Sequence, residues 1–144
     1  MEDMSARFAA RRRQAARVTE EIERWARRTS EIRAAAIVGS YARGQERMSS
    51  DIDVLVLSDA PDEIADSAWF ASLHPAAHLV RSGRWGPVHE RRFRLRSGLI
   101  VELGFAPSTW ADVPLDEGTA RVLGDGHRIL HDDGLLRKAA AALG

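Results

Sequence analysis

The segment AAIVGSYARGQERMSSDIDVLVL, residues 35–57, decides the fold of this chain. One apolar run precedes Gly39-Ser40. A second run begins at Ile52, between Asp51 and Asp53, and continues to Leu57. Short apolar runs that are bounded by turn-forming residues are typical of buried β-strands. We therefore expect two strands, near residues 34–39 and 52–58, separated by a turn that carries the polar residues of the segment.

The two aspartates of this segment, Asp51 and Asp53, stand two positions apart. Side chains at positions i and i+2 of a strand point to the same face, so the two carboxylates are expected side by side. Two carboxylates that close repel each other unless one is protonated or a cation lies between them. Oxygen ligands of this kind suit Mg²⁺, which binds through one or two carboxylates plus substrate phosphates.

Gly39 and Ser40 form a candidate anion-binding turn upstream of the aspartates. Gly39 ends a strand where the backbone must turn sharply, and Ser40 offers a hydroxyl group and a backbone N–H. If residues 40–43 open a helical turn, their free N–H groups point at an anion. Arg43, in the same turn, either contacts a phosphate or pairs with a carboxylate to fix the turn, and the sequence leaves both interpretations open.

Gly39-Ser40, followed after ten residues by Asp-x-Asp at 51–53, resembles the signature of the DNA polymerase beta-type nucleotidyltransferase superfamily. The local forms Gly-Ser-x-Ala-Arg-Gly and Ser-Asp-x-Asp are most similar to its small stand-alone bacterial members, the minimal nucleotidyltransferases. The resemblance is dense over residues 36–57 and loose elsewhere. It implies an α/β fold with a mixed β-sheet and flanking helices. It also implies transfer of a nucleoside monophosphate, with ATP as the expected donor, and release of pyrophosphate.

The resemblance further implies how the site residues are used. Asp51 and Asp53 would hold two Mg²⁺ ions, and the Gly39-Ser40 turn would bind the β and γ phosphates of the nucleoside triphosphate. The family has a third acidic residue on a later strand, and the candidate is Glu102, the only charge in LIVELGF, residues 99–105. The family more often has Asp at this position. Glu102 has one more methylene group, and it would act either as a metal ligand or as the general base that takes a proton from the acceptor. The alternative interpretation is a charge on the solvent face of an edge strand.

Composition bounds the remaining possibilities. With 144 residues and no cysteine, we expect one nucleotidyltransferase domain over residues 1–144 without disulfides or thiolate metal sites. Neither a membrane span nor a signal peptide is evident, which favours a cytoplasmic protein. The formal net charge is zero, so no global field attracts nucleic acid, and a nucleic-acid partner is not expected.

Periodicity predicts the other elements. Residues 5–29, within an N-terminal segment 1–30, read as an amphipathic helix whose arginine run at 11–13 belongs to the solvated face. Residues 88–96 and 99–105 are expected to form a hairpin through Ser97-Gly98. We also expect helices over 62–73, at a Ser or Thr cap near 107–110, over 119–123 and over 134–143, strands at 77–80 and 126–130, and a loop at 81–87.

Several other residues are weaker candidates. Arg81, Arg84 and Arg92 would neutralise a triphosphate, but arginine is so frequent in this chain that a surface role explains each equally simply. Trp85, flanked by two glycines, would stack on a base, although tryptophan is first of all apolar mass. The five histidines have no metal-ligand spacing.

The acceptor is not determined by the sequence. It is either a small molecule held at the seam of a homodimer or, as in the toxin–antitoxin members of the resembled family, a hydroxyl group of a partner toxin. In the second case the chain would be an antitoxin-type protein adenylyltransferase. A different class of function also stays open, namely a catalytically silent nucleotide-binding or interaction module that keeps the fold.

Overall fold

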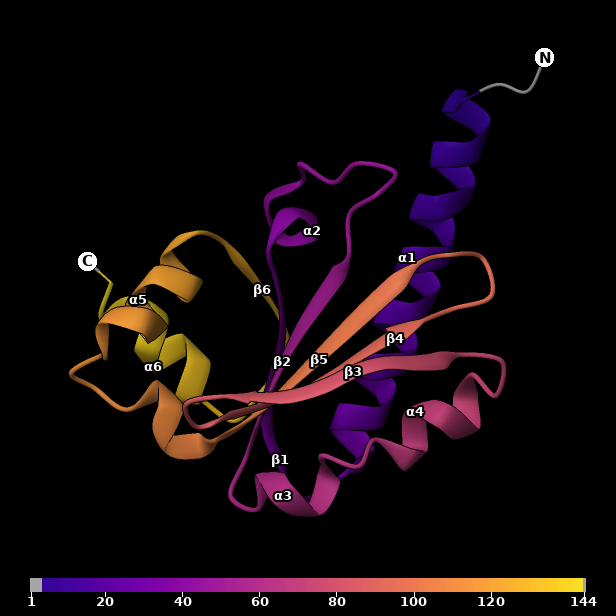
Figure 1. Cartoon of the computed structure of the whole chain (residues 1–144). Helices are drawn as coiled ribbons and strands as arrows, with labels where there is room; N and C mark the ends of the chain where they lie inside the picture. The colour runs from indigo at the N-terminus through magenta and orange to yellow at the C-terminus, as the bar shows by residue number, and fades with distance from the viewer. Residues whose placement is uncertain (1–3, 144) are drawn as a thin grey trace.

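The computed structural model describes residues 4–143, and within them six strands form one mixed sheet in the order β3-β4-β5-β2-β1-β6 (Figure 1). The strands are β1 Ile32–Val38, β2 Ile52–Ser58, β3 His78–Trp85, β4 Val88–Arg94, β5 Ile100–Pro107 and β6 His127–Asp132. The helices are α1 Met4–Arg28, α2 Ser40–Arg43, α3 Pro61–Ile64, α4 Ala68–Leu73, the 3₁₀ helix η1 Ser108–Ala111, α5 Glu117–Gly124 and α6 Leu135–Ala141. The expected α/β class with a mixed sheet and flanking helices is confirmed.

The two strands of the motif lie at the centre of the sheet. β1 pairs with β2 in antiparallel fashion, and β2 pairs with β5 in parallel fashion. The other neighbouring pairs are antiparallel. Because β2 has a strand on both sides and helices over both faces, its apolar run is buried almost throughout. The expected hairpin between residues 88–96 and 99–105 is confirmed as β4 and β5, with the turn at Ser97-Gly98.

Alternate residues of the strands point to opposite faces of the sheet and pack into two separate hydrophobic cores. On one face, α1 and α4 cover the sheet, and Ile22 and Phe70 pack with Val54 and Val56. On the other face lie η1, α5 and α6, which pack against Leu55 and its neighbours (Figure 1). Asp53 alternates with Val54, so its side chain belongs to the second face, the one that α5 and α6 only partly cover.

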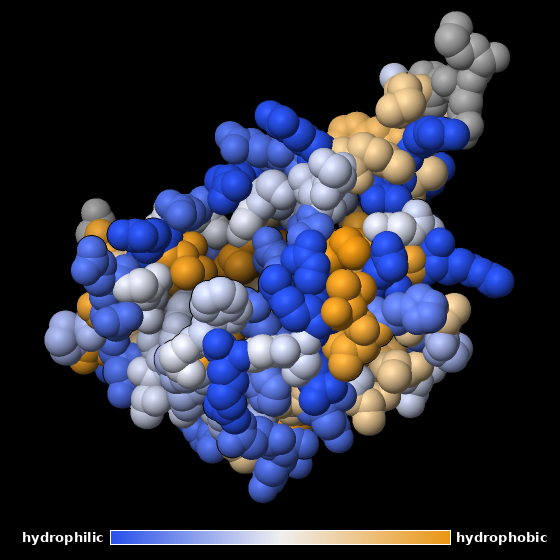
Figure 2. Space-filling view, in the orientation of Figure 1, coloured by the Kyte–Doolittle hydropathy of each residue, from blue (hydrophilic) through white to orange (hydrophobic). Residues whose placement is uncertain are grey.

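The N-terminal helix is amphipathic as expected. Ala15, Val18, Ile22 and Trp25 are buried on one stripe, and the ring of Trp25 stacks on Trp69 of α4 with 3.6 Å between centroids. Among the described helices, none has the length and apolar content to cross a membrane. The face seen in Figure 2 is mostly hydrophilic, with hydrophobic side chains in small groups.

Three local expectations are wrong. The helix expected over 62–73 is two helices, α3 and α4, because Ser67, with φ of 53°, has a left-handed backbone conformation that interrupts the helix. The loop expected at 81–87 belongs mostly to β3, which continues to Trp85 because backbone pairing with β4 does not depend on the Gly and Arg side chains. At residues 107–110, η1 begins after Pro107 and has no Ser or Thr side-chain cap.

Candidate metal centre and phosphate turn

The three predicted acidic residues lie together at one end of the central strands. Asp53 lies in β2, Asp51 directly precedes that strand, and Glu102 lies in β5. Parallel pairing places Glu102 opposite Asp53 in register, so their side chains share one face. A carboxylate oxygen from each of the three residues lies within 4.8 Å of the other two. The edge-strand interpretation of Glu102 is wrong, because β5 lies between β4 and β2.

The Gly39 turn lies directly against this acidic cluster. Val38, the last residue of β1, pairs with Asp53, so the turn begins beside that carboxylate. Gly39 has φ of 77°, and a Cβ atom at this position would lie 2.5 Å from Asp53 Oδ2. Two reasons therefore require glycine at position 39: the backbone is left-handed, and a side chain would collide with the carboxylate of Asp53. The two halves of the motif, ten residues apart in sequence, form one contiguous site.

Ser40 opens the four-residue helix α2, in which the N–H groups of Ala42 and Arg43 donate to Gly39 O at 3.0 and 3.3 Å. The Arg43 side chain runs away from the acidic cluster and lies against the turn between α5 and β6. Its Nη1 donates to Asp125 O at 3.4 Å, and a Cβ atom at Gly126 would lie 2.7 Å from Arg43 Cγ. In this arrangement Arg43 joins α2 to the C-terminal part of the chain through a main-chain carbonyl.

Two arginines, Arg92 and Arg81, neutralise part of the negative charge of the acidic cluster. Arg92 lies opposite Glu102 on β4 and binds two carboxylates at once, with Nη2 2.8 Å from Asp51 Oδ2 and Nη1 3.2 Å from Glu102 Oε2. Arg81 Nη2 lies 3.4 Å from Glu102 Oε1. Arg84, in contrast, pairs with the exposed carboxylate of Asp62.

In the sequence, no local pattern distinguishes Arg92 from the other two candidate arginines, Arg81 and Arg84. The register of the predicted hairpin is the signal that identifies Arg92 as a neighbour of Glu102. Arg92 precedes Glu102 by ten residues around the Ser97-Gly98 turn, and that turn makes the two residues cross-strand neighbours.

The electrostatics of the cluster favour a bound cation. Burial raises the pKa of Asp53 to about 7, and the nearby carboxylates of Glu102 and Asp51 add to the increase, although Arg92 opposes it. The pKa of Glu90 is also raised, by burial and by Glu102. Burial is the largest cause of this increase, and the two neighbouring carboxylates raise the pKa of Asp53 by more than Arg92 lowers it. Three oxygen donors with excess negative charge fit a divalent cation such as Mg²⁺.

A cavity of about 290 Å³ adjoins the cluster on the same face of the sheet. Asp53, Glu90 and Glu102 line one part of it, and the other walls are apolar. The apolar walls include Val38, Trp85, Val88, Trp110 and Val122. Gly104, two residues beyond Glu102, adds no side chain to the floor. The indole N–H of Trp85 donates to Glu90 Oε1, which connects the aromatic wall to the acidic one.

Comparison with known proteins agrees with this geometry. The family model described as "Nucleotidyltransferase domain" matches residues 19–105, which run from the second half of α1 to β5 and contain the Gly39 turn and all three acidic residues. No curated protein matches the chain significantly. Members of this family act on a nucleoside triphosphate with a divalent metal ion. The chain belongs to the nucleotidyltransferase domain family, as a minimal nucleotidyltransferase of the DNA polymerase beta-type superfamily.

Proposed function

We propose that this protein transfers AMP from ATP to a hydroxyl group of an acceptor in a Mg²⁺-dependent reaction that releases pyrophosphate. The observation that carries the proposal is the convergence of Asp51, Asp53 and Glu102, whose carboxylate oxygens lie within 4.8 Å of one another beside the Gly39 turn. A catalytically silent member of the family would have no need to keep these three repelling carboxylates together.

Each acidic residue has its own task in this reaction. Asp51 and Asp53 hold Mg²⁺, and Glu102 either completes the metal site or takes the proton of the acceptor hydroxyl. The bound metal supplies positive charge to the triphosphate and makes the acceptor hydroxyl easier to deprotonate. Because Asp53 has a raised pKa in the free protein, metal binding also displaces a proton near neutral pH.

The Gly39-Ser40 turn binds the phosphates that leave as pyrophosphate. Ser40 offers its hydroxyl group and its N–H at the beginning of α2, beside the carboxylate of Asp53. Donors held rigidly at this point orient the leaving group without reorganisation during the reaction.

The nucleoside of the donor occupies the adjoining cavity. The cavity is lined by Val38, which directly precedes the phosphate turn, and by Asp53 and Glu102 of the acidic cluster, so it adjoins both parts of the proposed site. Its apolar walls include Trp85 and Trp110, whose flat rings suit a nucleobase. A volume of about 290 Å³ is close to the lower limit of ordinary small-molecule sites.

Two acceptors fit the proposed chemistry, a hydroxyl of a small molecule and a side-chain hydroxyl of a partner protein. A silent module is the second candidate function, and one observation favours it: Arg92 already pairs with Asp51 and Glu102. In an active enzyme this guanidinium must give way to the metal, whereas in a silent module it stays.

The deciding experiment is incubation with each α-labelled nucleoside triphosphate, Mg²⁺, and either cell lysate or its metabolite fraction. Label on a protein band identifies a protein acceptor, and label on a small molecule identifies a metabolite. Transfer must disappear in EDTA and in the Asp53→Asn variant. Absence of label with every nucleotide and both fractions would favour the silent module.

A further inference from the structure

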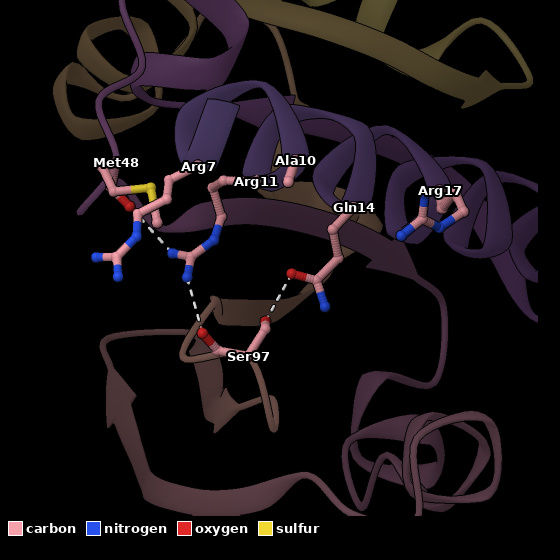
Figure 3. A pocket seen from close by; sticks show the side chains of 7 residues that line it. All are labelled: Arg7, Ala10, Arg11, Gln14, Arg17, Met48 and Ser97. Atoms are coloured by element: carbon pink, nitrogen blue, oxygen red, sulfur yellow. Dashed lines mark hydrogen bonds between the residues drawn. The ribbon is translucent and has the colours of Figure 1, made fainter. Parts of the chain in front are cut away.

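One side chain of α1 connects the two segments that lead into the acidic cluster. Arg11 Nη1 donates to Met48 O at 3.0 Å, and Arg11 Nη2 donates to Ser97 O at 2.9 Å. Figure 3 shows Arg11 extending from the helix between these two carbonyl groups, with Gln14 beside it accepting a hydrogen bond from the Ser97 hydroxyl at 2.6 Å. Met48 belongs to the loop between α2 and β2, and Ser97 to the turn between β4 and β5.

The next residue of α1 holds the same loop a second time. Arg12 Nε lies 3.1 Å from Glu46 Oε2, and the Glu46 side chain is only 10% exposed. The amphipathic pattern of the helix predicts this arginine run, residues 11–13, on the solvated face. For Arg11 that prediction is wrong, because a loop far away in sequence folds back over the helix and supplies main-chain acceptors, whereas Arg12 stays exposed as predicted and pairs with Glu46.

The place of these contacts along the chain gives them their significance. Met48 comes three residues before Asp51, and Ser97 comes five residues before Glu102. Asp53 and Glu102 are fixed by the hydrogen bonds between β2 and β5. Asp51 lies just outside β2, so its position relative to the other two carboxylates depends on the loop that Arg11 holds.

We infer that Arg11 is a positioning residue for the metal centre. By tying the loop before Asp51 to the turn before Glu102, it keeps Asp51 within ligand distance of the other two carboxylates before any cation arrives. Loss of the tie frees the loop and weakens metal binding, while the sheet and the core below it persist. The inference rests on the proposed metal-dependent function, since it concerns the affinity of that same site.

The test compares Arg11→Met with Arg13→Met. Both changes remove one positive charge from the same helix and keep an unbranched apolar stem, but Arg13 is exposed. Mn²⁺ is titrated into the nucleotide-free protein and followed by electron paramagnetic resonance, with thermal melting as the check on folding. Loss of a partner that orients metal ligands typically lowers metal affinity by about 10- to 100-fold. We expect at least a tenfold loss for Arg11→Met, a change of less than about twofold for Arg13→Met, and partial rescue by Arg11→Lys.

Three outcomes decide the matter. Equal Mn²⁺ affinity in the wild-type protein and a folded Arg11→Met variant overturns the inference and leaves the proposed function intact. An equal loss in Arg11→Met and Arg13→Met also overturns it, because the effect is then one of general charge. Absence of Mn²⁺ binding in the nucleotide-free wild-type protein overturns the inference alone, because substrate phosphates complete the proposed metal site. The proposed function fails only if labelled transfer is absent as well. If Arg11→Met does not fold, Arg11→Gln, whose shorter side chain cannot reach both carbonyl groups, carries the same comparison, and unchanged affinity in that variant overturns the inference.

Discussion

Asp53 and Glu102 lie within neighbouring parallel strands, whereas Asp51 lies on the loop that precedes β2. The first two are held by backbone hydrogen bonds that any side chains would permit. Asp51 is held by side chains from elsewhere, directly by Arg92 and, through the loop, by Arg11. The proposed metal centre would thus combine two carboxylates that the sheet holds with a third whose position depends on long-range polar contacts. Rigid elements hold a site more accurately than loops do, so the loop-held ligand requires the additional support.

The sharpest test of the strand-held pair is Asp53→Asn, which should abolish transfer while the fold survives. The same change should stabilise the metal-free protein at pH 8. The pKa of Asp53 in the folded protein, about 7, lies above the ordinary value of 3.8. The contribution of Asp53 to stability is therefore fully present below about pH 4 and is lost as the pH rises through 7. Each pKa unit corresponds to about 1.4 kcal/mol. Thermal melting in EDTA from pH 4 to 8 should therefore show a flatter profile for the variant.

An Asp53→Asn protein that melts below the wild type at pH 8 in EDTA would show that the carboxylate is structurally required. In that case the cluster would be an ion-pair network with the arginines, and the metal-site hypothesis would be wrong.

The second test separates the two strand-held residues from each other. Glu102→Gln should leave Mg²⁺-dependent ATP binding within a few-fold, because Glu102 is proposed to act on the acceptor. It should reduce turnover at least about 100-fold, the effect typical of a lost general base. Calorimetric titration and a turnover assay measure the two quantities independently. Full activity in the variant would leave acceptor activation to the metal alone.

Ser40→Ala probes the turn on the other side of Asp53. Backbone N–H groups of the turn remain, so only one hydrogen bond to a charged group is lost. Such a bond contributes about 1.5–3 kcal/mol, which corresponds to a loss of roughly 10- to 100-fold in kcat/KM. Steady-state kinetics measure it. A Ser40→Ala enzyme as inactive as the Asp53 variant would indicate a nucleophilic serine.

Arg92→Gln tests the direct side-chain support of Asp51. The change leaves Asp51 and Glu102, whose side chains are 24% and 17% exposed, without their shared guanidinium. We expect a loss of about 1–3 kcal/mol in EDTA, the cost of leaving a partly buried charged group without its partner. Mg²⁺ should restore most of it, since the cation then supplies the missing charge. Arg84→Gln, at an exposed ion pair, is the matched control and should change little. Loss of stability that Mg²⁺ does not restore would mean that arginine and metal do not share the site.

The smallest expected effect concerns the cavity wall. Trp85 is 62% exposed, so Trp85→Ala should hardly affect folding. Stacking of one base on an aromatic ring contributes about 1–3 kcal/mol, so ATP binding should weaken by roughly fivefold or more. Tripolyphosphate binding should not change, and Trp85→Phe, which keeps a ring but loses the hydrogen bond to Glu90, should retain most of the ATP affinity. Equal ATP affinity in Trp85→Ala and the wild type would remove this residue from the nucleoside site.

The sequence by itself was sufficient to predict the central part of the molecule. The apolar runs around the motif identified β1 and β2. Asp51 and Asp53 lie close together as expected, but Asp51 comes just before β2, so the alternation of the strand does not by itself place it. The hairpin ending in Glu102 was also predicted correctly. These features follow from local patterns, since the alternation of a strand and the turn at Ser97-Gly98 are properties of short segments.

Only the tertiary structure determined what surrounds this part. Arg11 and Ser97 are 86 residues apart in sequence, and nothing in a helical pattern distinguishes an arginine that meets a folded-back loop from one that faces solvent. Likewise, Arg92 differs from Arg84 only through the partner strand and the carboxylates it happens to face. Local periodicity determines which elements form and which face each residue takes. The partner of a long charged side chain depends on which distant segments pack beside it, and that is decided only when the whole sheet assembles.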